Sequence, residues 1–163
     1  NAYMETSVPG IYAFGDLASP YQLKHIANAE ARLISKRLVG GAKTPMVYDG
    51  GPHAIFCHPQ VASVGLTERT VQQRGMDHVK ATRKYADTAY GWASEDNDSF
   101  VKVVANPTTR QLLGAHIIGP QASLLIQPLV QGMKYGQTVD EMAQVIYIHP
   151  ALTEVVEQAL LEL

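Results

Sequence analysis

The stretch YIHPALTEVVEQALLEL, which includes the last residue of the sequence, holds a histidine and a glutamate that could share a proton. An imidazole titrates near neutral pH, and the proline at 150 restricts the backbone of His149, so that its ring is aimed. Glu154 falls in the first turns of a predicted helix, where it could bind one ring nitrogen and fix the tautomer. This spacing predicts an acid/base pair. The alternative is that His149 only begins the helix and Glu154 interacts with the helix dipole; the residues alone leave both open.

A second candidate is Asp16, which follows the strand-forming run GIYAF and precedes a predicted helix. Ligands bind where strands end and helices begin, and a carboxylate there can accept hydrogen bonds from sugar-like hydroxyl groups. Gly15 permits a close approach. The simpler interpretation of this position is a turn aspartate that caps the helix.

The sequence predicts neither a metal site nor disulfide chemistry within this chain. His53, Cys57 and His58 lie in HAIFCH, and in a strand His58 would point away from the other two, so a structural role is expected and no metal site is predicted. Cys57 is the only cysteine, which excludes an intrachain disulfide and a redox cysteine pair within this sequence. Neither a Gly-x-Gly-x-x-Gly fingerprint nor a Walker-type loop is present.

The composition argues against some classes of binding partner. Hydrophobic residues make up 46% of the 163, enough for a sizeable core. Thirteen basic and fifteen acidic residues give a net charge of −2, which argues against a nucleic-acid binder or a polybasic membrane module. No apolar run approaches the roughly 18 residues of a membrane span. We therefore expect a cytoplasmic protein with small or neutral partners.

The chain changes character near residue 45. Before it, a strand at 11–14 and a helix with apolar residues from Leu23 to Leu38, stopped by Gly40 and Gly41, form one strand-turn-helix unit. Such a unit has no parallel partner strand in this sequence, so residues 1–45 are expected to be the tail of a larger domain.

Residues 46–163 instead combine closely spaced strands with later helices. Strands are predicted in AIFCH, VASVG and DHVKATRKY, followed by a hairpin that turns at 106–109. Helices are predicted in three places. The first is at about 121–135, a short one begins with a capping box of Thr138 and Glu141, and the last is the amphipathic C-terminal stretch. This order predicts an α+β domain with an antiparallel sheet and flanking helices.

Three separated motifs resemble the pyridine nucleotide-disulfide oxidoreductases. TSVPGIYAFGD resembles their second flavin-binding motif, IFCHPQVASVGLTE the start of their dimerisation domain, and HPALTE their closing His-Pro-x-x-x-Glu. The resemblance implies that residues 1–45 are the remnant of an FAD-binding domain and residues 46–163 a dimerisation domain. It further implies cis peptides at His149-Pro150 and, less strictly, at His58-Pro59.

The same resemblance assigns roles to individual residues. Gly15 and Asp16 would contact the FAD ribityl or phosphate region, and Leu23, Lys24 and His25 would begin a helix that faces the flavin. His149, oriented by Glu154, would be the acid/base of the partner subunit's active site, so the homodimer would be required for catalysis.

Within the family, SPYQLKHIANAEAR and YGWASEDNDSFVKVVA resemble the branch that reduces mycothiol disulfide with NADPH. Ala151 departs from the His-Pro-Thr of dihydrolipoamide dehydrogenases, which remain an alternative. FAD and NADPH are expected in a longer enzyme, whereas this stretch alone is expected to bind no cofactor and to be inactive. The alternative from a different class is a non-catalytic, self-associating module.

Overall fold

The computed structural model describes residues 1–41, 43–48 and 50–163, and it separates into two compact units. The first comprises Asn1–Gly51 and the second Pro52–Leu163. The sequence had indicated the change of character slightly earlier, between residues 45 and 46. Each unit is described by itself below.

The first unit is built on one long helix, α1 (Lys24–Gly40), preceded by a 3-10 turn, η1 (Gly15–Leu17). Gly41 ends α1 in the left-handed conformation, with φ 69°, as the two glycines predicted. The predicted strand at 11–14 is wrong: Tyr12 makes only an isolated antiparallel bridge to Glu5. A strand needs a neighbour along its length, and the described part of this unit supplies a single bridge.

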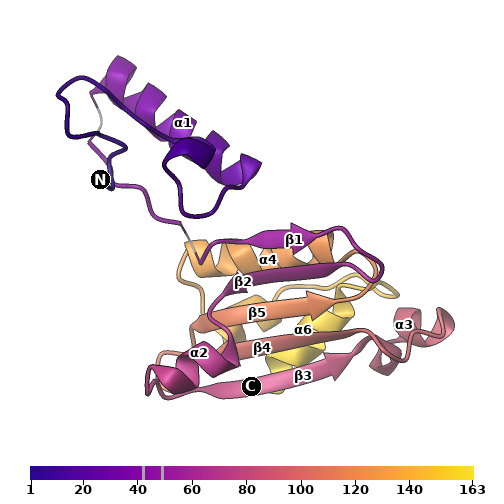
Figure 1. Ribbon diagram of the computed structural model, residues 1–163. Helices are drawn as coiled ribbons and strands as arrows, with labels where there is room; N and C mark the ends of the chain where they lie inside the picture. The colour runs from indigo at the N-terminus through magenta and orange to yellow at the C-terminus, as the bar shows by residue number, and fades with distance from the viewer. Residues whose placement is uncertain (42, 49) are drawn as a thin grey trace. The chain divides into compact units, whose positions relative to one another are not determined.

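The second unit is a five-stranded antiparallel sheet with helices packed on it, which confirms the predicted α+β class. The strands run in the order β1-β2-β5-β4-β3 (Figure 1). Their bounds are β1 His53–Ile55, β2 Val61–Gly65, β3 Val79–Lys84, β4 Phe100–Ala105 and β5 Leu112–Ile118. The remaining elements are α2 Glu68–Gln73, η2 Tyr85–Asp87, α3 Ala89–Ala93, α4 Ala122–Lys134, α5 Val139–Ala143 and α6 Glu154–Leu161.

One face of the sheet forms the core. Side chains alternate along β2 and β5, so that Ala62 and Ile117, which are paired across the two strands, both point into the core and are buried. The longer helices α4 and α6 pack against this face (Figure 1). In α6 the stripe expected from the sequence is buried, including Val155, Val156 and Ala159.

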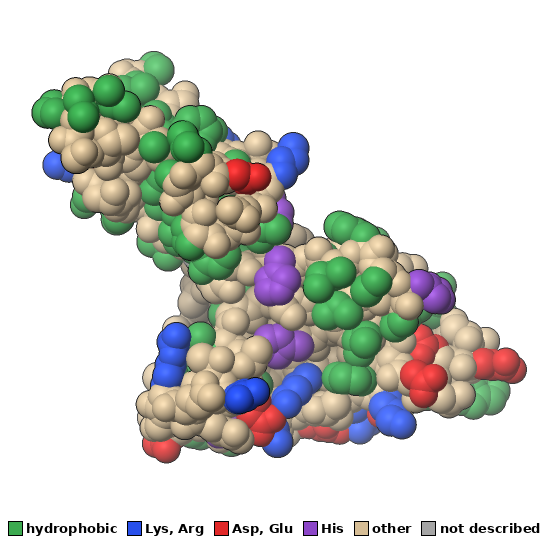
Figure 2. Space-filling model, viewed as in Figure 1, with side chains coloured by type: hydrophobic (Ala, Val, Ile, Leu, Met, Phe, Trp, Pro, Cys, Tyr) green, Lys and Arg blue, Asp and Glu red, His purple; other side chains and the backbone are tan. Residues whose placement is uncertain are grey.

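The opposite face carries a mixture of apolar, histidine and basic side chains over the strands (Figure 2). The strand register places four apolar residues in one row across it: Ile55, Val61, Ile118 and Phe100. The next row holds His53, Ser63, His116 and Lys102. Amphipathic alternation thus separates a buried core face from a face that is partly accessible in this chain.

In the second unit, two features differ from the sequence-based expectation. The first strand ends at Ile55, so Cys57 and His58 lie in a turn and the strand prediction through His58 is wrong. Here the chain must reverse so that β2 can pair antiparallel with β1. The short helices α2 and α3 were not predicted, because five or six residues are too few to show a helical period.

Neither unit contains, in its described residues, a helix long and apolar enough to cross a lipid bilayer.

Candidate functional site

His149 and Glu154 lie together at the start of α6. His149 Nδ1 is 2.7 Å from Glu154 Oε1, and the Ala151 backbone N–H donates to Glu154 Oε2 at 2.9 Å. The peptide bond between His149 and Pro150 is cis, and so is that between His58 and Pro59, as expected. The carboxylate therefore joins the histidine ring to the backbone of the turn that precedes the helix.

The accessibility of the two side chains differs sharply. The side chain of His149 is 68% exposed, whereas that of Glu154 is 13% exposed. The hydrogen bond from the Ala151 N–H, followed by that from His149, holds the pKa of Glu154 below its usual range. Since the ionised carboxylate can only accept, Nδ1 is the donor in this contact, and Nε2 is the ring nitrogen that does not bond to Glu154.

Exposed apolar side chains precede His149 in the sequence. Ile146 is 99% exposed and Ile148 is 75% exposed, and Val145 beside them is also exposed. Large aliphatic side chains gathered in this way typically mark a contact surface.

The first unit holds the other predicted site residues. Gly15 is buried with φ 68°, and Asp16, the next residue in η1, is exposed. Leu23 is the N-cap of α1, and Lys24 and His25 form its first turn. The turn therefore offers an exposed acceptor, and the helix start offers backbone N–H groups and the positive end of the helix dipole.

The sequence did not reveal Glu30, which lies in α1 and is completely buried. Its Oε2 accepts a hydrogen bond of 2.6 Å from the Gly15 N–H, and its Oε1 accepts one of 2.9 Å from the Tyr48 hydroxyl. A signal was present, because Glu30 is spaced four residues from both Ile26 and Ile34, which are buried on the same helix.

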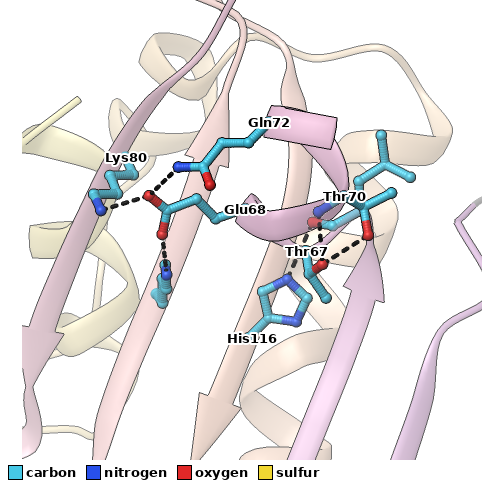
Figure 3. A network of polar contacts seen from close by, with 8 residues as sticks. Thr67, Glu68, Thr70, Gln72, Lys80 and His116 are labelled. Atoms are coloured by element: carbon cyan, nitrogen blue, oxygen red, sulfur yellow. Dashed lines mark hydrogen bonds and ion pairs between the residues drawn. The ribbon is translucent and has the colours of Figure 1, made fainter. Parts of the chain in front are cut away.

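A second polar network, also missed, lies on the partly accessible face of the sheet (Figure 3). Glu68 accepts from Lys80 Nζ at Oε1 and from Lys102 Nζ at Oε2, each at 2.5 Å. These hydrogen bonds, led by that of Lys102, lower the pKa of Glu68 to about 2. On the same face, the two ring nitrogens of His116 lie 3.1 Å from Ser63 Oγ and from the Leu66 carbonyl oxygen. Burial lowers the pKa of this histidine.

His53, Cys57 and His58 do not form part of a metal-binding group. Across residues 1–41, 43–48 and 50–163, no three histidine, cysteine, aspartate or glutamate side chains are arranged to hold a metal ion. Cys57 Sγ instead lies 3.0 Å from the Pro59 carbonyl oxygen within its own turn.

Known proteins resemble this chain over nearly its whole length. It is 48% identical to mycothione reductase of Mycobacterium tuberculosis, over 99% of this chain and 36% of that protein. It is 37% identical to dihydrolipoyl dehydrogenase of Corynebacterium glutamicum, over 96% of this chain and 34% of that protein. The chain thus spans about a third of the length of these relatives.

Solved structures share the fold. The crystal structure of LpdA from Mycobacterium tuberculosis superposes with a TM-score of 0.92 at 24% identity, covering 99% of this chain and 35% of that one. The HOCl-induced flavoprotein disulfide reductase RclA from Escherichia coli gives 0.88 at 22% identity, covering 98% and 37%. The family described as pyridine nucleotide-disulphide oxidoreductase, dimerisation domain, matches residues 51–160. The chain therefore belongs to the pyridine nucleotide-disulphide oxidoreductases and carries their dimerisation domain.

Proposed function

We propose that this chain is part of a cytoplasmic, FAD- and NADPH-dependent reductase of mycothiol disulfide, to which it supplies an acid/base histidine. The observation that carries the proposal is the exposed His149 ring, held at Nδ1 by Glu154. The choice of disulfide and of NADPH is supported by the higher identity to mycothione reductase, 48%, than to dihydrolipoyl dehydrogenase, 37%.

His149 would act on the sulfur that leaves when the substrate disulfide is opened. A thiolate of the enzyme attacks one substrate sulfur, the S–S bond breaks, and the other sulfur departs with the bonding pair. His149 Nε2 gives this sulfur its proton, so that a neutral thiol is released. Glu154 keeps Nδ1 protonated and stabilises the positive charge whenever Nε2 also carries a proton.

Residues 1–45 would be the remnant of an FAD-binding domain. FAD, when bound, passes reducing equivalents from NADPH to the redox disulfide. The residues present fit such a ligand, because Asp16 is an exposed acceptor beside the buried Gly15. The first turn of α1, Lys24 and His25 after Leu23, would face the flavin with its positive dipole end.

Residues 46–163 would form the homodimer in which His149 serves the partner's active site. A dimerisation domain implies self-association, and the exposed apolar side chains just before His149 are suited to an interface. By itself this chain would then be inactive and without cofactor.

The test is steady-state turnover of the longer enzyme that contains this chain. Mycothiol disulfide, lipoamide and glutathione disulfide would be compared with NADPH and with NADH, in the wild type and in His149→Ala. We expect preference for mycothiol disulfide and NADPH, and a loss of about 100-fold or more in kcat for the variant with flavin still bound.

His58→Ala is the matched control, since His58 is also exposed and also precedes a cis proline. It should keep wild-type turnover. Full activity of His149→Ala would refute the acid/base role. Preference for lipoamide with NADH would instead make the enzyme a dihydrolipoamide dehydrogenase and leave the role of His149 intact.

A further inference from the structure

A buried carboxylate in α1 remains without a role in the proposed reaction. The Glu30 side chain is completely shielded from solvent in the middle of the helix, where a charged group is costly unless it is bonded. Both of its oxygens have partners, the Gly15 N–H at 2.6 Å and the Tyr48 hydroxyl at 2.9 Å. These contacts tie the middle of α1 to the backbone of the η1 turn.

The turn at Gly15 is fixed on both sides of that residue. Its N–H donates to Glu30, and its carbonyl oxygen accepts from the N–H groups of Ala18 at 2.9 Å and Ser19 at 2.7 Å. Its φ of 68° lies in the left-handed region, which a glycine adopts at little cost. Three hydrogen bonds therefore hold the backbone that leads into Asp16, although Asp16 itself is exposed.

Tyr48 secures the other oxygen of Glu30. Burial, followed by the hydrogen bond to Glu30, raises the pKa of Tyr48, so that its hydroxyl remains protonated and donates. Glu30 thereby connects three segments of the first unit: the η1 turn, the helix α1, and the stretch that contains Tyr48.

We propose that Glu30 is a positioning residue for flavin binding, which fixes the Gly15 turn so that Asp16 is held ready to accept from a flavin hydroxyl group. This inference rests on the proposed function, in which Asp16 contacts the flavin. The helix α1 would then contribute to flavin binding in two ways, through its N-terminal turn and through Glu30. A fixed turn avoids the entropy cost of ordering Asp16 when the ligand binds.

The test compares two substitutions of similar size in the longer flavoprotein. Glu30→Gln keeps a carbonyl oxygen that can accept from the Gly15 N–H, and its amide can donate to the Tyr48 oxygen. Glu30→Met fills the same space but accepts from neither partner, and it suits a buried helix position. FAD affinity of the apoprotein, measured by titration, and the melting temperature are recorded for both, with Asp16→Ala in parallel.

We expect the FAD Kd to rise by about tenfold or more in Glu30→Met and to stay within about threefold of wild type in Glu30→Gln. Glu30→Met is expected to melt below Glu30→Gln, because it leaves the Gly15 N–H without its acceptor, so FAD affinity is measured at a temperature at which both variants are folded. If Glu30→Met binds FAD as the wild type does while Asp16→Ala weakens binding, the role of Glu30 is refuted and the flavin site stands. If both Glu30 variants lose affinity equally with their stability, Glu30 is only structural. Unchanged affinity in Asp16→Ala would instead refute the proposed flavin contact itself.

Discussion

Among the described residues, Glu68 is the carboxylate whose pKa is displaced furthest, to about 2, and this displacement links stability to pH. The pKa is lower in the folded chain than in the unfolded one, so the contribution to stability is present above about 4.5 and is lost as the pH falls toward about 2. In Glu68→Gln this contribution is absent at every pH. We expect the difference in melting temperature between wild type and variant to be largest near pH 7 and to shrink progressively below pH ~4.5.

Lys102→Met provides the control, because the Lys102 hydrogen bond is the first cause of the shift. It should reduce the same pH dependence without abolishing it, because Lys80 still contacts Glu68. A gap between wild type and Glu68→Gln that stays constant from pH 7 to pH 2 would contradict the linkage.

Which site residues the sequence reveals depends on how far apart the partners lie along the chain. His149 and Glu154 are separated by five residues at a helix start, so their contact could be inferred from spacing alone. Glu30 meets Gly15 across 15 residues and Glu68 meets Lys102 across 34, and such distances are closed only by tertiary packing. A buried glutamate also contradicts the expectation that charged residues face solvent, which is why Glu30 was missed.

At the scale of elements, α5 is the helix whose beginning the sequence specifies most completely. Thr138 Oγ1 accepts from the Glu141 N–H at 3.1 Å, and Glu141 Oε2 accepts from the Thr138 N–H at 2.8 Å, as the capping box predicted. Thr138→Ala should lower the free energy of unfolding by about 1 kcal/mol, measured by urea denaturation. Thr138→Ser keeps the hydroxyl acceptor and should lose less than about half of that. Equal losses in the two variants would show that the cap contributes nothing.

The elements that could be predicted are those whose own residues show a periodic pattern of apolar side chains or a capping residue. The hairpin of β4 and β5, the helix α4 and the buried stripe of α6 follow from alternation, turn residues and helical spacing. The strand predicted at 11–14 does not form, because a strand needs a pairing partner as well as an apolar run. The described residues pair it at a single position, Tyr12 with Glu5. The helices α2 and α3 were missed because each is shorter than two helical turns, too short for a repeat to show.

For the molecule as a whole, the proposed chemistry is divided between the two units. Under the proposed function, the first would supply the Gly15 turn to a flavin and the second would supply His149 for proton transfer. A histidine that is 68% exposed has no enclosed site of its own, and catalysis in water-excluded surroundings requires that something cover it. Under the proposed function a second subunit provides this cover, so association and activity should be linked.

Ile146 and Ile148 are the side chains whose substitution should test this link, since both are exposed and they closely precede His149 in the sequence. A charge buried at the centre of an interface weakens association strongly, so Ile146→Asp should raise the dimer Kd of the longer enzyme by about 30-fold or more. Sedimentation velocity over a concentration series measures this, and turnover per flavin should fall in step with the dimer fraction. Ile146→Val keeps an apolar side chain and should retain both dimer and activity. A fully active dimer in Ile146→Asp would mean that this segment does not contact the partner, and the case for His149 serving the partner's active site would fail with it.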